Sequence, residues 1–132
     1  MRFVKVCVVL LAVFLSACST ESSSDELFKE VMVFHDEVMP YMGTLYKAEK
    51  KMKADIAAMD STVQEKREIM QAQLDTLVNA QDRMNQWMRG MKAAYSKELT
   101  EQEKINVLKE QLEEVKVINE ELKAAKKIAD SL

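Results

Sequence analysis

Three long stretches of the chain carry apolar residues at alternating steps of three and four. That spacing places the apolar side chains on one stripe of an α-helix, as in helices that pack side by side in a coiled coil. The helices are predicted over residues 26–59, 63–94 and 101–129. Short connections place consecutive helices antiparallel. The pattern therefore predicts an all-α fold, an elongated up-down-up three-helix bundle, with a longer coiled coil that dimerises as the alternative.

Helix boundaries are marked by residues that favour helix ends. A Ser or Thr followed three residues later by Glu or Gln can form a capping box, which satisfies free N–H groups at a helix start. Such pairs occur at each expected start: Ser23 with Glu26, Ser61 with Gln64 or Thr62 with Glu65, and Thr100 with Glu103. Inside the first helix, Pro40 removes a backbone donor and clashes with the preceding turn. We therefore expect a kink over residues 36–40.

Polar residues interrupt the three apolar stripes. Burial of a polar group costs free energy unless the group finds a hydrogen-bond partner. We therefore expect a thin, partly wet core that leaves room for self-association or for a helical protein partner. The polar residues on the stripes, apart from one histidine, are Glu49, Arg67, Gln81, Asn119 and Lys126.

The first eighteen residues have the pattern of an export signal. Arg2 and Lys5 precede an apolar run over residues 6–15. The run is too short for a membrane span of roughly 20 residues, but it suits the core of a signal peptide. The motif Leu-Ser-Ala-Cys at residues 15–18 resembles the lipobox of bacterial lipoproteins. This resemblance implies cleavage after residue 17 and attachment of lipid to the sulfur of Cys18.

Three segments follow from this interpretation. Residues 1–17 are expected to form a cleaved signal peptide, residues 18–25 a lipidated cysteine with a disordered polar tether, and residues 26–132 the bundle. Two or three acyl chains hold a protein stably on a membrane. Ser19 directly after the cysteine favours the outer membrane, by the best-known sorting rule for such lipoproteins. We expect a lipid-anchored protein of the cell envelope that faces the periplasm or the cell surface.

Composition excludes several functions. Gly occurs twice and Pro once in 132 residues, too few for a fold rich in turns. Removal of the signal takes the net charge from −3 to −5, and a nucleic-acid binder needs a basic face. The chain has no Gly-rich phosphate loop, and its single His cannot pair with a free thiol because the mature Cys is lipidated. We therefore expect neither an enzyme nor a nucleic-acid binder.

His35 is the residue whose position most suggests chemistry. It lies at the centre of the first apolar stripe, and an antiparallel hairpin would place it opposite residue 86. Thioether and imidazole ligands suit Cu(I) and Ag(I), and an indole face can lie over a cation. The residues expected around the ion are Met32, His35, Met39, Met84 and Met88, with Trp87 nearby.

A plain core explains the same cluster without a metal. Met is a flexible side chain that fills gaps in helical cores, and His35 could hydrogen-bond to Gln81, Gln86 or water. Another ligand, such as haem held by His and Met, is a further alternative. The main functional hypothesis is a non-enzymatic structural or protein-interaction role at the membrane. Cu(I) or Ag(I) binding is the alternative, with Cu(I) as the candidate cofactor.

The segments HDEVMPYM at residues 35–42 and MNQWM at residues 84–88 resemble a group of small bacterial lipoproteins labelled "viral A-type inclusion protein". The resemblance covers most of the mature chain. It implies a lipid-anchored helical protein, and it implies no activity, cofactor or partner.

Overall fold

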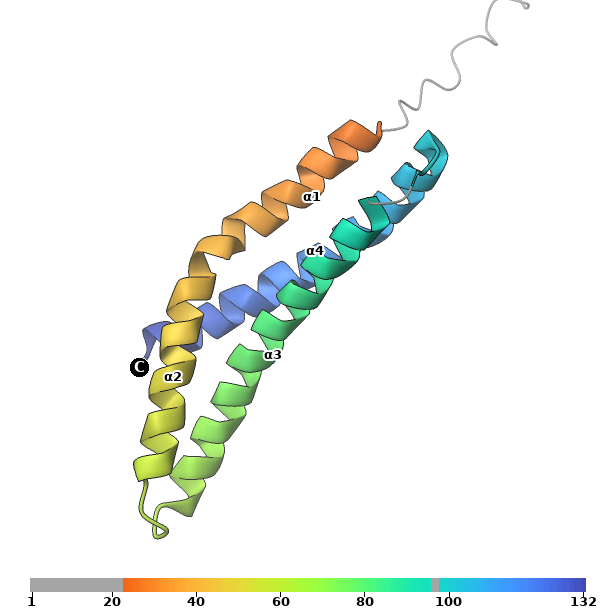
Figure 1. The fold of residues 1–132 in the computed structure, drawn as a ribbon. Coiled ribbons are helices and arrows are strands. Elements are labelled where there is room, and N and C mark those ends of the chain that lie inside the picture. Colours follow the sequence, from red (N-terminus) through yellow and green to blue (C-terminus); the bar gives the residue numbers. More distant parts are fainter. Residues whose placement is uncertain (1–22, 96–97) are drawn as a thin grey trace, which may run out of the picture.

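The structure is a computed structural model that describes residues 23–95 and 98–132. It consists of three helical rods packed as a bundle (Figure 1), which confirms the predicted all-α fold. The first rod is bent and contains two α-helices joined by a 3₁₀ turn. The elements in chain order are α1 (Ser24–Val38), η1 (Met39–Tyr41), α2 (Met42–Ala58), α3 (Gln64–Tyr95) and α4 (Glu101–Asp130).

The expected signal peptide, Cys18 and the tether as far as residue 22 lie outside the described residues. Within the described part, no helix has both the length and the apolar character needed to cross a bilayer. The remaining residues of the expected tether are folded. Ser24 is buried, and its backbone N–H donates to Glu101 Oε1 at 3.0 Å. This contact with α4 explains why α1 begins two residues earlier than predicted.

Two of the predicted capping boxes are confirmed. At the start of α1, Glu26 N donates to Ser23 Oγ at 3.3 Å, and Ser23 N donates to the Glu26 carboxylate at 3.2 Å. Thr100 and Glu103 form the same reciprocal pair at the start of α4. These bonds satisfy N–H groups that have no partner inside a helix.

The turn between α2 and α3 is held differently from the prediction. In the described structure its hydrogen bonds come from Asp60 and Arg67 rather than from either expected capping pair. Thr62 N donates to Asp60 Oδ1 at 2.9 Å, and Arg67 Nη2 donates to the carbonyl oxygen of Met59 at 2.6 Å. The guanidinium group of Arg67 therefore lies at the C-terminal end of α2, where helix carbonyls favour a cation.

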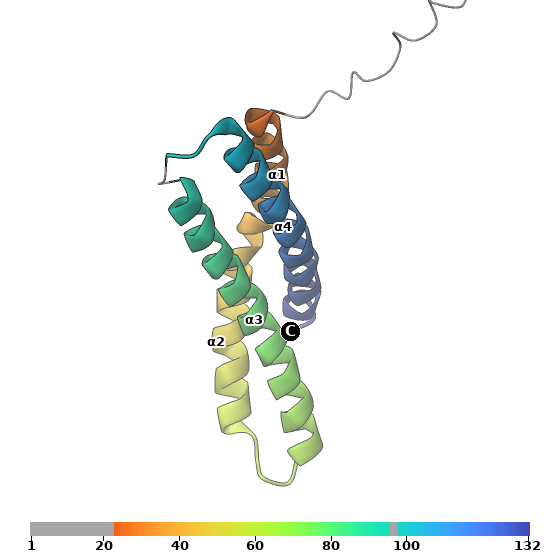
Figure 2. The ribbon, with the colours of Figure 1, turned by 90° about the vertical axis from the view of Figure 1, so that its right-hand side faces the viewer.

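The first rod changes direction at η1. The 3₁₀ turn spans Met39–Tyr41 and contains Pro40, which confirms the predicted kink. The two helices on either side have different neighbours, because α1 packs mainly against α4 and α2 mainly against α3. Figure 2 shows α4 running in front of α1, and both views show α2 and α3 lying together at the other end of the bundle. The bend therefore directs most of the packing of α1 toward α4 rather than α3.

The core runs along the bundle and joins all three rods. Its buried apolar residues lie between Leu27 and Ala125. A chain that begins at residue 19 therefore contains the whole core seen in the described residues. The largest apolar side chains that are fully buried are Leu45, Met52, Leu77, Met84, Leu108, Ile118 and Leu122.

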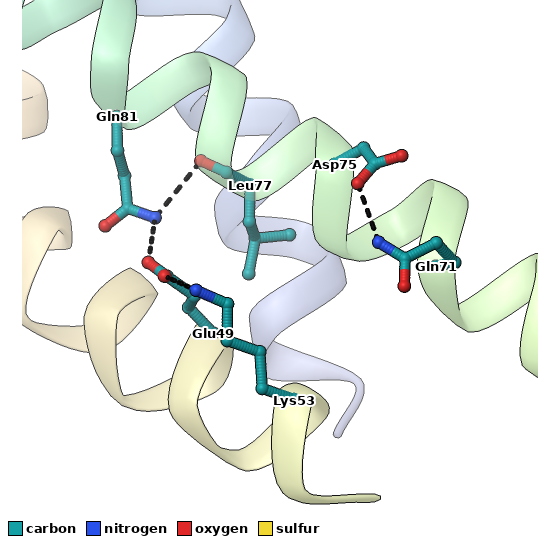
Figure 3. A network of polar contacts seen from close by, with 6 residues as sticks. All are labelled: Glu49, Lys53, Gln71, Asp75, Leu77 and Gln81. Atoms are coloured by element: carbon teal, nitrogen blue, oxygen red, sulfur yellow. Dashed lines mark hydrogen bonds and ion pairs between the residues drawn. The ribbon is translucent and has the colours of Figure 1, made fainter. Parts of the chain in front are cut away.

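A polar contact links α2 to α3 inside this core (Figure 3). Gln81 is 2% exposed, and its Nε2 donates to Glu49 Oε2 and to the Leu77 carbonyl oxygen, both at 3.2 Å. Lys53 Nζ donates to the other Glu49 oxygen at 2.6 Å. Lys53 therefore reaches the polar pair from its solvent side and balances the charge of the Glu49 carboxylate.

A second polar contact links α4 to α1 just before the bend. Asn119 is fully buried, and its Nδ2 donates to the Phe34 carbonyl oxygen at 2.8 Å and to Glu37 Oε2 at 2.9 Å. Lys123 Nζ lies 3.0 Å from Glu37 Oε1. The fifth polar residue of the stripes, Lys126, pairs instead with Asp130 within α4. The polar positions predicted from the stripes therefore find specific partners.

Replacement of the buried amide should weaken the bundle. We expect Asn119→Ala to lower the free energy of unfolding by about 2 kcal/mol, because Glu37 and the Phe34 carbonyl lose a buried donor. Urea denaturation of the 19–132 fragment, followed by circular dichroism, measures this change. Asn106→Ala is the matched control, since Asn106 is exposed on the same helix. Equal urea midpoints for the two variants would contradict the prediction.

Acid should loosen the contact between α1 and α4. The Asn119 amide and then Lys123 hold the pKa of Glu37 below its usual value near 4.5, and the Ser24 N–H lowers the pKa of Glu101. A lowered pKa adds stability that is present above pH 4.5 and is lost as the pH falls through the folded-state value.

When the pH is lowered below about 4.5, we expect the urea concentration at the unfolding midpoint of the 19–132 fragment to decrease. The fall should be shallower in the double variant Glu37→Gln/Glu101→Gln, which has no charge to lose at these two positions. Glu114→Gln, on the exposed surface of α4, should keep the wild-type slope. A double variant whose midpoint falls as steeply as that of the wild type would refute this account.

Candidate functional site

An open groove lies between α1 and the C-terminal part of α3. Because α1 packs on α4, the facing sides of α1 and α3 do not close over each other at this end of the bundle. The groove has a volume of about 320 Å³. We call it the aromatic–methionine groove. Its lining residues are Phe28, Met32 and His35 from α1, and Trp87, Met88, Met91, Lys92 and Tyr95 from α3.

The lining follows helical spacing on both sides. Residues three and four apart lie on one face of a helix, and the α1 residues of the groove follow this rule. A neighbouring, buried stripe of α1 contains Leu27, Val31 and Val38, and α1 packs mainly on α4. The single stripe predicted for this helix is therefore two stripes in the structure. Phe28 and His35 belong to the one that lines the groove.

Two aromatic contacts cross the groove. The rings of Phe28 and Tyr95 meet edge to face, with centroids 5.4 Å apart. The rings of His35 and Trp87 are 5.7 Å apart and tilted by 32°. A pair of the Phe28–Tyr95 kind contributes about 0.5–1.5 kcal/mol beyond the area that it buries. All four residues line the same groove, so the two contacts bridge α1 and α3 within it.

Trp87 forms the buried wall of the groove. The residue is 4% exposed, and its Nε1 donates to the Gln111 carbonyl oxygen of α4 at 3.4 Å. This hydrogen bond satisfies the only polar atom of the indole, and the carbon atoms of the ring form part of the groove lining. At the end of the groove, burial raises the pKa of Tyr95, and the charges of Asp25 and Glu101 raise it further. The Tyr95 hydroxyl therefore stays neutral near pH 7.

One ring nitrogen of His35, Nδ1, has a polar partner, and the other, Nε2, is a candidate metal donor. Its Nδ1 lies 2.8 Å from Asp36 Oδ1, and its side chain is 15% exposed. An ionised carboxylate only accepts hydrogen bonds, so the neutral ring is assigned the tautomer with the proton on Nδ1. Nε2 then keeps a lone pair. The hydrogen bond found here goes to Asp36, which was not among the expected partners.

The structure brings together four of the six residues predicted for the metal cluster. Met32, His35, Trp87 and Met88 all line the aromatic–methionine groove. Met39 and Met84 are not among its lining residues. Met84 is fully buried in the core, and Met39 lies in η1 and packs against the core. Met39 keeps an α-helical backbone conformation and donates its N–H to the His35 carbonyl oxygen, so it lies one turn beyond His35, past the residues that line the groove.

Sequence reasoning left Met91, Lys92 and Tyr95 out of the cluster. Met91 follows Met88 by three residues, so helical spacing carried the missing signal. The atoms of the groove that could bind a metal are the thioether sulfurs of its methionines and the imidazole of His35. Across residues 23–95 and 98–132, no group of three or more His, Cys, Asp and Glu side chains could hold a metal ion.

Fold and groove together define a small helical-bundle protein with one apolar, methionine-rich groove at the end where the described chain begins. No family model, no curated protein and no solved structure matches the chain.

Proposed function

We propose that the protein is a lipid-anchored, non-enzymatic binding protein of the cell envelope, and that the aromatic–methionine groove is its binding site for a small ligand. One observation carries the proposal. Aromatic and thioether side chains from two helices line a groove that the bundle itself does not fill. A helical protein normally buries such side chains against another helix.

The size and lining of the groove support a small ligand. A volume of about 320 Å³ is at the lower end of the range for small-molecule sites, which are mostly apolar with a few placed polar groups. Here the polar groups are His35 and Lys92. Thioether side chains are flexible and polarizable, so they adapt to the shape of a ligand.

A docked helix of a partner protein is the competing interpretation. A helix in a groove needs an uninterrupted apolar channel over several turns. The Phe28–Tyr95 and His35–Trp87 contacts cross the space between α1 and α3 at two points. These contacts favour a small ligand over a helical partner or a second copy of the chain.

The anchor follows from the sequence. The lipobox-like motif ends at Cys18, and α1 begins six residues later at Ser24. The groove begins one turn further on, at Phe28. An anchor at Cys18 would therefore hold the groove within about 25 Å of the lipid surface. This position suits a ligand that is met at the membrane.

The anchor can be tested by mass spectrometry of the full-length protein purified from membranes. We expect the loss of residues 1–17 and a mass increase from acyl groups on Cys18, because the thiol beside small residues is the lipid acceptor in lipobox motifs. Cys18→Ser should remain unprocessed and unacylated. A wild-type protein that keeps residues 1–17, or that carries an unmodified Cys18, would remove the anchor from the proposal.

The groove can be tested with an apolar fluorescent dye such as an anilinonaphthalene sulfonate. We expect the 19–132 fragment to bind the dye, and the double variant Met32→Gln/Met88→Gln to bind it roughly tenfold more weakly, because polar amides replace apolar contact area. The matched control is Val33→Gln/Ile69→Gln, which makes the same kind of change at exposed positions of α1 and α3.

Three results would contradict the small-ligand groove. The first is a wild-type fragment that does not bind the dye, and the second is equal weakening in the control. The third is dye binding that disappears as the protein dimerises in sedimentation experiments, because a second copy would then occupy the groove.

A further inference from the structure

We propose that the ligand of the aromatic–methionine groove is a soft monovalent cation, Cu(I) or Ag(I). The donors are His35 Nε2 and the thioether sulfurs of Met32, Met88 and Met91. This inference rests on the proposed function, since it names the ligand of the same groove. The four donors line one space of about 320 Å³, two from each of the facing helices.

Helical spacing positions the donors in pairs. Met32 and His35 are three residues apart on α1, and Met88 and Met91 are three residues apart on α3. Side chains at this spacing are neighbours on one face of a helix. Each helix therefore presents two donors to the other helix across the groove.

The hydrogen bond of His35 prepares it as a ligand. Metal-binding histidines commonly donate their second ring N–H to a carboxylate, which fixes the tautomer and makes the ligating nitrogen more basic. Asp36 has this role here, with Oδ1 at 2.8 Å from Nδ1. Asp36 is also an acidic group close to the site, and it offsets the positive charge of the ion. Lys92 on the groove lining opposes the ion, but it is exposed and therefore screened by solvent.

The chemistry of the donors selects the metal. Thioether sulfur and imidazole favour Cu(I) and related soft ions, whereas carboxylate and carbonyl oxygens favour Mg²⁺, Ca²⁺ and Mn²⁺. None of the four donors is a carboxylate. The indole of Trp87 adds an aromatic face in contact distance of the His35 ring, and such faces attract cations. Trp87 is also the only tryptophan of the chain, so its fluorescence reports on the groove.

Burial distinguishes Met32 from the methionines that only fill the core, whereas Met91 belongs to the core cluster and Met88 packs against it while both also line the groove. Met52 and Met84 are fully buried, as expected of side chains that fill gaps in a core. Met32 is only partly buried, and it lies outside the core cluster, at the groove. Gap filling explains Met52 and Met84, but it does not explain a thioether held beside an imidazole at an open groove.

The test compares two sets of Met→Leu changes, which nearly conserve volume and remove the sulfur ligand. The groove variant is Met32→Leu/Met88→Leu/Met91→Leu, and the control is Met52→Leu/Met84→Leu in the core. Each 19–132 fragment is titrated with Ag(I) while Trp87 fluorescence is recorded. Cu(I) affinity is measured anaerobically by competition with a chromogenic Cu(I) chelator.

We expect the wild type to bind one equivalent of Ag(I) with a change in Trp87 emission. The groove variant should bind at least about tenfold more weakly, and Asp36→Asn about tenfold more weakly, because a carboxylate beside a metal-bound histidine is worth 10–100-fold in affinity. The control variant should retain wild-type affinity, and Mg²⁺ should cause no change.

Absence of stoichiometric Ag(I) and Cu(I) binding by the wild type would overturn the inference, as would equal loss in the core control. The dye experiment separates this failure from failure of the proposed function. If the wild type and the groove variant bind the dye equally while neither binds the ions, the groove stands and the cation is wrong. If the wild type binds neither the dye nor the ions, both proposals fail.

Discussion

The ring of Pro40 is the constraint on which the rest of the architecture depends. It has no N–H to donate to the carbonyl four residues earlier, so the first rod cannot continue as one straight α-helix past residue 38. The 3₁₀ turn that follows directs α1 toward α4 and α2 toward α3. A straight rod would run along α3 over its whole length, as in a simple antiparallel hairpin. The bend instead leaves α1 open over the C-terminal part of α3, which packs against α4 on its other side.

Polar contacts then fix how the rods are aligned. Apolar stripes of Leu, Val and Met allow helices to slide or rotate at little cost, because one apolar contact replaces another. A buried amide does not tolerate this, since an unpaired donor in the core loses free energy. Asn119 finds its acceptors only when α4 meets α1 beside Glu37, and Gln81 finds Glu49 only in the observed register of α2 on α3. The two amides therefore specify the alignment on both sides of the bend.

The sequence predicted the helices well because their signals are local. Capping boxes, apolar spacing and Pro40 act within a few residues, and they placed the helix ends of α3 and α4 within one residue. Counting outward from the turn between the first two predicted helices placed His35 opposite residue 86. In the structure the imidazole ring of His35 lies beside the neighbouring residue, Trp87. Spacing states which side chains share a face, but it does not state which neighbour that face meets. For this reason the split of the α1 stripe, and the departure of Met39 and Met84 from the groove, could not be predicted.

The same bend connects the fold to the chemistry proposed for the groove. If α1 packed on α3, Met32 and Met88 would be core side chains like Met84, and their sulfur atoms would have no distinct role. Because α1 packs on α4, these thioethers border open space, and the remaining ring nitrogen of His35 shares that space. Neutral soft donors can hold a soft cation there without the burial of an unpaired charge on the apo protein. A site of this kind costs the empty bundle little stability, since its lining remains apolar contact surface when no ion is bound.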